Sequence, residues 1–232
     1  MNWFLLATIA ALLFVGYILW GVAKVIIIDR YSYARFWRRT AAAAVGGRAI
    51  RLVALGDSTF QGLGASRPLR GTVGRVAQYV EERTGRPVHI ENVSVTGAKA
   101  VDVARVQLSA ALKDADIIIV AVGANDALKL SGLTVFEQSM KKIVEALPDD
   151  RTIMADVALV RDREKYQAIL DRYRHDRGLL RADLEEAFRV PKSRKRLSGK
   201  DFFHPSDYGY ELWFAGFKPA VDKLIIARKL AK

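Results

Sequence analysis

Residues 116–122 read DIIIVAV, an apolar run that follows a single acidic residue. Apolar runs without polar alternation are typical of parallel strands that are covered by helices on both faces. A second such run, IRLVAL, occupies residues 50–55, and apolar stretches at 87–95, 151–157 and 179–184 are the other candidate strands. The sequence therefore predicts a buried parallel sheet of about five strands, with 179–184 at its edge.

The segments between these strands carry apolar residues at helical spacing. The alternation of strands and helices predicts an α/β fold, a three-layer α/β/α domain with a flavodoxin-like parallel sheet. Ligands of such sheets bind beyond the carboxyl ends of the strands, so polar residues that directly follow a strand are the candidates for function. The predicted helices cover residues 71–84, 101–112, 135–147, 164–177 and 205–230.

The N-terminal residues Trp3–Ala23 form 21 consecutive positions without a charge. As a helix this segment would be about 31 Å long, the thickness of a bilayer core. A cleaved signal peptide is the alternative, but no basic side chain precedes the apolar run, which favours a retained anchor. The predicted organisation is a transmembrane helix over 1–28, a basic juxtamembrane segment and linker over 29–48, and the α/β domain over 49–232.

The net charge of +12 is concentrated in three segments. Residues 1–40, 187–200 and 218–232 carry net charges of +4, +6 and +4, so the rest of the chain is nearly neutral. No nucleic-acid-binding motif accompanies these charges, and nucleic acid is not an expected partner. The basic residues after the apolar segment favour a single-pass membrane protein whose α/β domain lies on the cytoplasmic side. The 187–200 segment is expected either to face anionic lipid or to be a solvated loop.

Three short polar motifs follow the predicted strands. Gly56-Asp57-Ser58 follows the first strand, and Ser58 is a candidate nucleophile or, alternatively, a helix N-cap. Gly97 and Asn125 follow the second and third strands and could donate hydrogen bonds to an oxyanion, although residues of these types are also common in turns. The glycine spacing matches neither a dinucleotide-binding fingerprint nor a P-loop, and the chain has no cysteine. No cofactor and no metal is expected.

The segment Asp201-Phe202-Phe203-His204-Pro205 carries a carboxylate and an imidazole three residues apart. Residues at this spacing can meet within one turn, which would let Asp201 orient His204. A structural role for His204 at the start of a helix is the alternative.

Together, Gly56-Asp57-Ser58, Gly97, Gly123-Ala124-Asn125-Asp126 and Asp201–Pro205 resemble the conserved blocks of the SGNH hydrolases, the GDSL esterase/lipase family, in the family's order. The resemblance spans about residues 50–230. It implies a three-layer fold and ester hydrolysis through an acyl-enzyme. It also implies Ser58 as nucleophile, His204 as general base, Asp201 as its orienter, and Ser58, Gly97 and Asn125 as the oxyanion hole.

The anchor and the basic segments favour a lipid-like or membrane-presented ester as substrate. An acyltransferase or glycan O-acetylesterase with the same triad is the alternative, and a catalytically inactive membrane-bound binding module is a third. The oligomeric state and the acyl chain length do not follow from the sequence.

Overall fold

The computed structural model of the protein describes residues 3–43, 46, 48–108, 110–189 and 196–231. Its centre is one sheet of five parallel strands in the order β2-β1-β3-β4-β5. This is the predicted flavodoxin-like order. The strands are β1 (Ile50–Leu55), β2 (Val88–Asn92), β3 (Ile117–Val120), β4 (Thr152–Ala155) and β5 (Leu180–Ala182).

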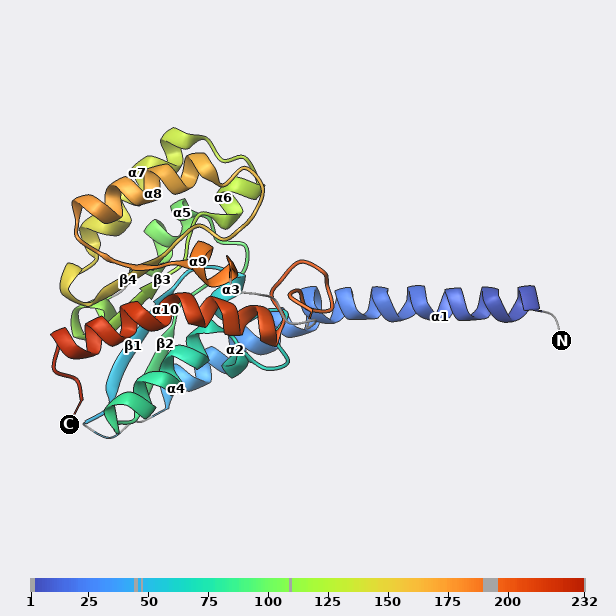
Figure 1. The fold of residues 1–232 in the computed structure, drawn as a ribbon, viewed down its shortest axis with the longest axis horizontal. Coiled ribbons are helices and arrows are strands. Elements are labelled where there is room, and N and C mark those ends of the chain that lie inside the picture. The colour runs from blue at the N-terminus through green and yellow to red at the C-terminus, as the bar shows by residue number, and fades with distance from the viewer. Residues whose placement is uncertain (1–2, 44–45, 47, 109, 190–195, 232) are drawn as a thin grey trace.

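Helices cover both faces of the sheet, and alternate strand residues supply the two cores (Figure 1). One core joins Leu52 and Ile119 to α2, α4, α9 and α10, and the other joins Val53 and Ile118 to α5, α7 and α8. The helices are α2 (Arg30–Ala42), α3 (Ser58–Gln61), α4 (Thr72–Thr84), α5 (Ala100–Asp102), α6 (Ala124–Leu128), α7 (Leu133–Ala146), α8 (Glu164–Asp176), α9 (Leu184–Arg189) and α10 (Asp207–Ala227). The three-layer α/β/α architecture is confirmed.

The helix predicted over 101–112 is not continuous. The chain forms α5, then a π-helix, η3 (Val103–Gln107), and after Leu108 a 3₁₀-helix, η4 (Ala110–Asp114). Short 3₁₀ segments at η2 (Pro68–Arg70) and η5 (Asp149–Arg151) complete the element order. The wider π turn places the Gln107 side chain against the backbone at Gly56, and π turns often occur at functional sites.

The N-terminal apolar segment is the helix α1 (Trp3–Ala23), which projects from the domain (Figure 1). It continues through a π-helical segment, η1 (Lys24–Asp29), into α2, so the helical segment reaches from Trp3 to Ala42. This segment is long and apolar enough to cross a membrane, and a signal sequence would meet the same criteria.

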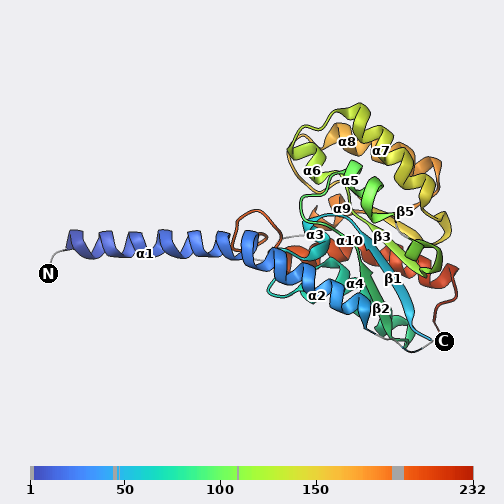
Figure 2. The same ribbon diagram turned by 180° about the vertical axis from the view of Figure 1, so that it is seen from behind.

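Residues 30–42, within the predicted basic juxtamembrane segment and linker, form the helix α2. α2 lies along the domain beside β2 and α4 (Figure 2). Tyr33 and Trp37 are buried, and their side chains donate hydrogen bonds to the carbonyl oxygens of Ala65, at 2.9 Å, and Gln61, at 3.0 Å. Three members of the predicted basic segment, Lys192, Arg194 and Lys195, lie outside the described residues.

Candidate active site

Ser58 lies at the turn between β1 and α3, at the carboxyl end of β1, which pairs with β2 on one side and β3 on the other. Asp57 caps α3 because its Oδ1 accepts hydrogen bonds from Thr59 N at 2.9 Å and Thr59 Oγ1 at 2.8 Å. The helix therefore begins at Ser58 itself, and the Ser58 side chain is held in one place by a short, capped turn.

The structure brings Ser58, His204 and Asp201 together, although 146 residues separate the first two. The distance from Ser58 Oγ to His204 Nε2 is 2.9 Å, and His204 Nδ1 lies 2.5 Å from Asp201 Oδ2. Hydroxyl, imidazole and carboxylate thus form one hydrogen-bonded chain. This geometry allows the imidazole to accept the serine proton while the carboxylate orients the ring.

The backbone fixes Asp201 independently of the histidine ring. Asp201 Oδ1 accepts hydrogen bonds from Phe203 N at 3.2 Å and His204 N at 3.1 Å. Partial burial acts to raise the pKa of Asp201, but the hydrogen bonds from His204 and the two amides outweigh it and leave the pKa below its usual value. The carboxylate is therefore ionised at neutral pH, as an orienter of an imidazolium must be.

The segment that carries Asp201 and His204 is a tight loop closed on itself. Gly199 N donates to His204 O at 2.7 Å, and Ser206 N donates to Leu197 O at 2.8 Å. The chain after Ser58 packs directly on this loop at Gly64, where a Cβ atom would lie 2.8 Å from His204 Cβ. Only glycine permits that approach, so Gly64 couples the serine segment to the histidine segment.

Asn125 lies near Ser58, but its amide is already hydrogen bonded. Its Nδ2 donates to Asp57 Oδ2 at 3.0 Å and to Ala98 O at 3.1 Å. These two bonds occupy both amide hydrogens, which the sequence-based role as an oxyanion donor did not anticipate. The amide therefore links the Asp57 turn to the segment after β2.

Gly97 lies in that same segment, next to Ala98, and is not among the described residues that line the cavity beside Ser58. Its backbone has φ +79°, and its carbonyl oxygen lies 3.5 Å from Lys129 Nζ. Its role as an oxyanion donor stays a prediction.

Both aspartates at the strand ends form hydrogen bonds within the protein. Asp57 accepts hydrogen bonds from Thr59 and Asn125, and Asp126 Oδ2 accepts one from Ala100 N at 2.9 Å. Burial raises the pKa of Asp57 above its usual value, although the bonds from Thr59 and Asn125 oppose that shift. Among the described residues, no cluster of three histidine or acidic side chains is arranged to hold a metal.

A cavity of about 250 Å³ opens beside Ser58 and His204. Most of its lining side chains are apolar, and they come from α6, from the loop after β4, from α9, from the Asp201 loop and from α10. The cavity could hold the acyl part of an ester against the serine hydroxyl. The apolar lining residues include Leu128, Leu159, Val160, Leu184, Phe188, Leu197, Phe203 and Trp213. The sequence patterns did not single out these residues, because they belong to loops and helix ends without a common period.

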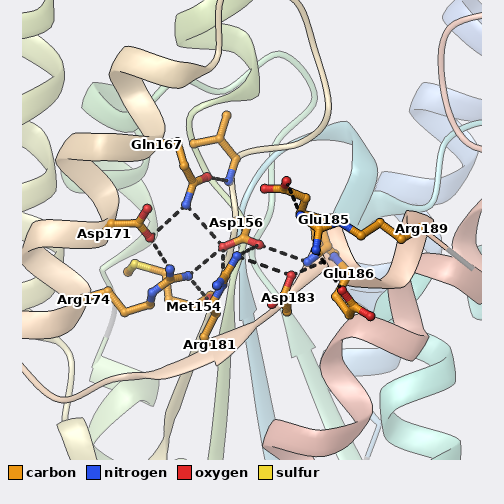
Figure 3. A network of polar contacts seen from close by, with 12 residues as sticks. Met154, Asp156, Gln167, Asp171, Arg174, Arg181, Asp183, Glu185, Glu186 and Arg189 are labelled. Carbon is orange, nitrogen blue, oxygen red and sulfur yellow. Dashed lines mark hydrogen bonds and ion pairs between the residues drawn. The ribbon is translucent and has the colours of Figure 1, made fainter.

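A polar network supports one wall of this cavity (Figure 3). Asp156 follows β4 and is 1% exposed, and its carboxylate accepts hydrogen bonds from Arg174 and Arg181, each at 2.9 Å. It also accepts one from Leu184 N at 3.1 Å, at the start of α9. Burial acts to raise the pKa of Asp156, but the two guanidinium groups outweigh it and lower the pKa. The ion cluster thus ties the end of β4 to the helix that lines the cavity.

The family follows from a match over most of the chain. The GDSL-like Lipase/Acylhydrolase family model matches residues 54–212, which include Ser58, Gly97, Asn125, Asp201 and His204. The chain belongs to this family. It is therefore an ester hydrolase, and the predicted family resemblance is confirmed.

Individual relatives of this GDSL-type hydrolase are distant in sequence. The uncharacterized protein YpmR of Bacillus subtilis (strain 168) is 23% identical over 199 residues, which cover 70% of this chain and 78% of YpmR. The crystal structure of TesA matches with a TM-score of 0.61 at 16% identity, over 75% of this chain and 99% of TesA. A lipase/acylhydrolase from Enterococcus faecalis matches with a TM-score of 0.61 at 18% identity, over 75% and 96% of the two chains. These structures share the fold.

Proposed function

We propose that this GDSL-type hydrolase is a membrane-anchored serine esterase in which Ser58 is the nucleophile, His204 the general base and Asp201 its orienter. The observation that carries the proposal is the continuous contact from Ser58 Oγ through His204 to Asp201, with distances of 2.9 and 2.5 Å. The cavity beside the hydroxyl supplies a place for the ester.

In the proposed reaction, Ser58 Oγ attacks the carbonyl carbon of the ester while His204 Nε2 takes the hydroxyl proton. The imidazolium then returns this proton to the leaving alcohol, and the acyl group stays on Ser58. A water molecule, deprotonated by His204, releases the acid and restores the serine. Asp201 accepts the Nδ1 hydrogen bond throughout and stabilises the imidazolium.

The proposed oxyanion hole consists of the Ser58 and Gly97 amides and the Asn125 side chain. The Ser58 amide belongs to the first turn of α3, where amides lack intrahelical acceptors. Asn125 can take part only if one amide hydrogen leaves Asp57 or Ala98 when the tetrahedral intermediate forms, since both hydrogens are in use. An oxyanion accepts a stronger hydrogen bond than the neutral carbonyl oxygen of Ala98, and this difference favours the exchange.

The proposed substrate is a lipid-like ester presented by the membrane. The exposed apolar helix α1 supports anchoring, and the apolar lining of the cavity supports a hydrocarbon acyl group. The basic residues that follow α1 favour a domain on the cytoplasmic side. Intact-mass measurement of the protein from the membrane fraction tests retention of the anchor, because cleavage of a signal peptide would remove α1.

Labelling with a fluorophosphonate tests the nucleophile. The full-length protein should form one covalent adduct on Ser58, identified by peptide mass spectrometry, and Ser58→Ala should lose both the adduct and p-nitrophenyl butyrate hydrolysis. Ser66→Ala, which changes an exposed serine outside the cavity lining, is the matched control and should be labelled normally. An adduct that persists in Ser58→Ala contradicts the assignment, and no adduct in wild type supports the inactive binding module.

A second measurement distinguishes hydrolysis from acyl transfer. Added glycerol should leave the yield of free acid from p-nitrophenyl butyrate nearly unchanged if water is the acceptor. Formation of acylglycerol in its place would identify an acyltransferase.

A further inference from the structure

The loop that carries Asp201 and His204 rests on the base of α1. A Cβ atom at Gly21 would lie 3.1 Å from Lys200 Cβ and 3.3 Å from Lys200 O, and Gly21 is the only buried residue among the described residues of α1. Lys200 Nζ also lies 6.0 Å from the centre of the Tyr17 ring. Figure 1 shows this loop against the domain-proximal end of the projecting helix.

The same helix is joined rigidly to the serine segment. After Asp29 it continues as α2, where Tyr33 and Trp37 hydrogen bond to the backbone of Ala65 and Gln61. Gln61 is the last residue of α3, which begins at Ser58. The continuous helix from α1 to α2 therefore contacts both the serine segment and the loop that carries Asp201 and His204. These contacts fix the orientation of the active site relative to the axis of α1.

The position of Gly21 sets the depth of the loop. The uncharged segment ends at Ala23, so Gly21 lies about 3 Å from the end of that segment at the usual rise per residue. The polar interface on each side of a bilayer core is about 5–7 Å thick. If α1 spans the membrane, the loop at Lys200 lies at the boundary between the hydrocarbon core and this interface.

The exposed side chains of the loop match that environment. Phe202 and Phe203 are 58% and 60% exposed, and the Arg196 guanidinium lies 4.0 Å from the centre of the Phe202 ring. Phe202 has φ +59°, a left-handed backbone that is strained for an aromatic residue and that holds its ring outward. Exposed aromatic rings beside basic groups are typical of segments that enter a membrane interface.

We propose that the loop from Arg196 to His204 docks on the bilayer with Phe202 and Phe203 inserted between anionic lipids, and that the ester enters the cavity from the membrane. Phe203 forms part of the cavity wall and contacts the His204 ring, with centroids 4.9 Å apart. The cavity mouth, which also includes the exposed Leu128 and Leu159, then opens toward lipid. This inference rests on the proposed function, and it narrows the substrate to an acyl ester that resides in the bilayer.

Depth-dependent fluorescence quenching tests the docking. The chain has no cysteine, so Phe202→Cys can be labelled with a bimane in the full-length protein and reconstituted in vesicles of phosphatidylcholine with 25% phosphatidylglycerol. A doxyl group at a shallow position on the lipid should quench the label at residue 202. Aqueous iodide should quench this label at least fivefold less than it quenches a label at Glu82→Cys, an exposed site near the end of α4. Equal iodide quenching at the two sites would overturn docking. Protection that depends on the protein-to-lipid ratio would point to a second copy of the chain and would also overturn it.

Activity separates this inference from the proposed function. Phe202→Asn suits the left-handed backbone and leaves the cavity lining unchanged, so hydrolysis of p-nitrophenyl butyrate should stay within twofold of wild type. Hydrolysis of 1-oleoylglycerol in the same vesicles should fall at least tenfold, and Phe202→Trp should restore it. Equal oleoylglycerol turnover by Phe202→Asn would overturn membrane entry while the esterase assignment stands. If the wild-type protein hydrolyses neither ester, the proposed function itself is contradicted.

Discussion

The side chain of Gln107 pairs with the backbone of Gly56 through two hydrogen bonds. Gly56 N donates to Gln107 Oε1, and Gln107 Nε2 donates to Gly56 O, both at 2.8 Å. The amide thus satisfies both polar groups of the residue that follows β1, two positions before Ser58. Gln107 is fully buried and belongs to the π-helix η3. This π-helix therefore helps to position the backbone that leads to Ser58.

We expect Gln107→Leu to destabilise the protein and to lower kcat. The substitution keeps the volume but leaves the buried Gly56 N–H unpaired, at a cost of about 1–3 kcal/mol, while Gly56 O keeps its hydrogen bond from Val95 N at 3.1 Å. Urea unfolding measures the first effect, and p-nitrophenyl butyrate turnover measures the second. Gln78→Leu, at an exposed position with one side-chain contact, is the control and should change stability by less than about 0.5 kcal/mol. A similarly small change in Gln107→Leu would show that the pairing does not hold the turn.

Asn125→Ala should lower kcat for a soluble ester by about 10²–10³, the usual loss on removal of one oxyanion donor, with little change in KM. Steady-state kinetics provide the test. Because Asn125 also ties Asp57 to Ala98, unfolding should be measured on the same variant. If stability falls while kcat is retained, the amide only joins these two segments and the oxyanion role is wrong.

Asp156→Asn should destabilise the fold by about 3–5 kcal/mol, because the buried carboxylate shared by Arg174 and Arg181 would lose its charge, and Arg174 would keep only Asp171 as a charged partner. The native pKa of Asp156 lies below its usual value, so its ionisation stabilises the protein above the unfolded-state pKa of about 4 and this contribution is lost as the pH falls through the native pKa. The difference in the free energy of unfolding between wild type and variant should therefore be constant from pH 8 to 5 and shrink below about pH 4. Urea unfolding across that range checks it, and a difference that already shrinks between pH 8 and 6 would implicate another group.

The orientation of the domain can be tested with Glu82→Cys as the only thiol of the chain. Since basic residues follow α1, we expect this cysteine to resist an impermeant maleimide in intact cells and to react after lysis. Labelling before lysis would place the domain on the outer side.

Much of the fold could be predicted because buried parallel strands leave unbroken apolar runs. The strand over 50–55 was predicted with its observed bounds, and the contact between Asp201 and His204 was accessible from their spacing. The contact between Ser58 and His204 was not, since no local pattern links residues 146 positions apart, and only the family resemblance placed them together. The lining of the cavity was also missed, because loops carry no periodic signal.

The segment 29–48 shows a second limit of sequence patterns. Its arginines suggested a basic juxtamembrane segment and linker, and Tyr33, Phe36 and Trp37 within it recur at the spacing of one helix face. In the structure that face is the docked side of α2, with Trp37 only 2% exposed. The arginines dominated the composition of this segment, whereas the three aromatic residues at helical spacing indicated the buried face of α2.

The docking of α2 predicts where the stable domain begins. A soluble fragment of residues 30–232 should be more stable than one of residues 49–232 by at least about 3–5 kcal/mol, the usual cost of losing one large buried aromatic side chain. The shorter fragment would also leave the carbonyl oxygens of Gln61 and Ala65 without their donors, next to the serine segment.

Urea unfolding of both fragments, followed by circular dichroism, measures the difference. Trp37→Phe within the 30–232 fragment is the matched control, because it keeps an aromatic ring but removes the hydrogen bond to Gln61 O, and it should cost about 1–2 kcal/mol. If the two fragments unfold at the same urea concentration, α2 contributes nothing to the domain and the original boundary at residue 49 stands. If only the 49–232 fragment loses turnover of p-nitrophenyl butyrate, α2 also holds the nucleophile in place.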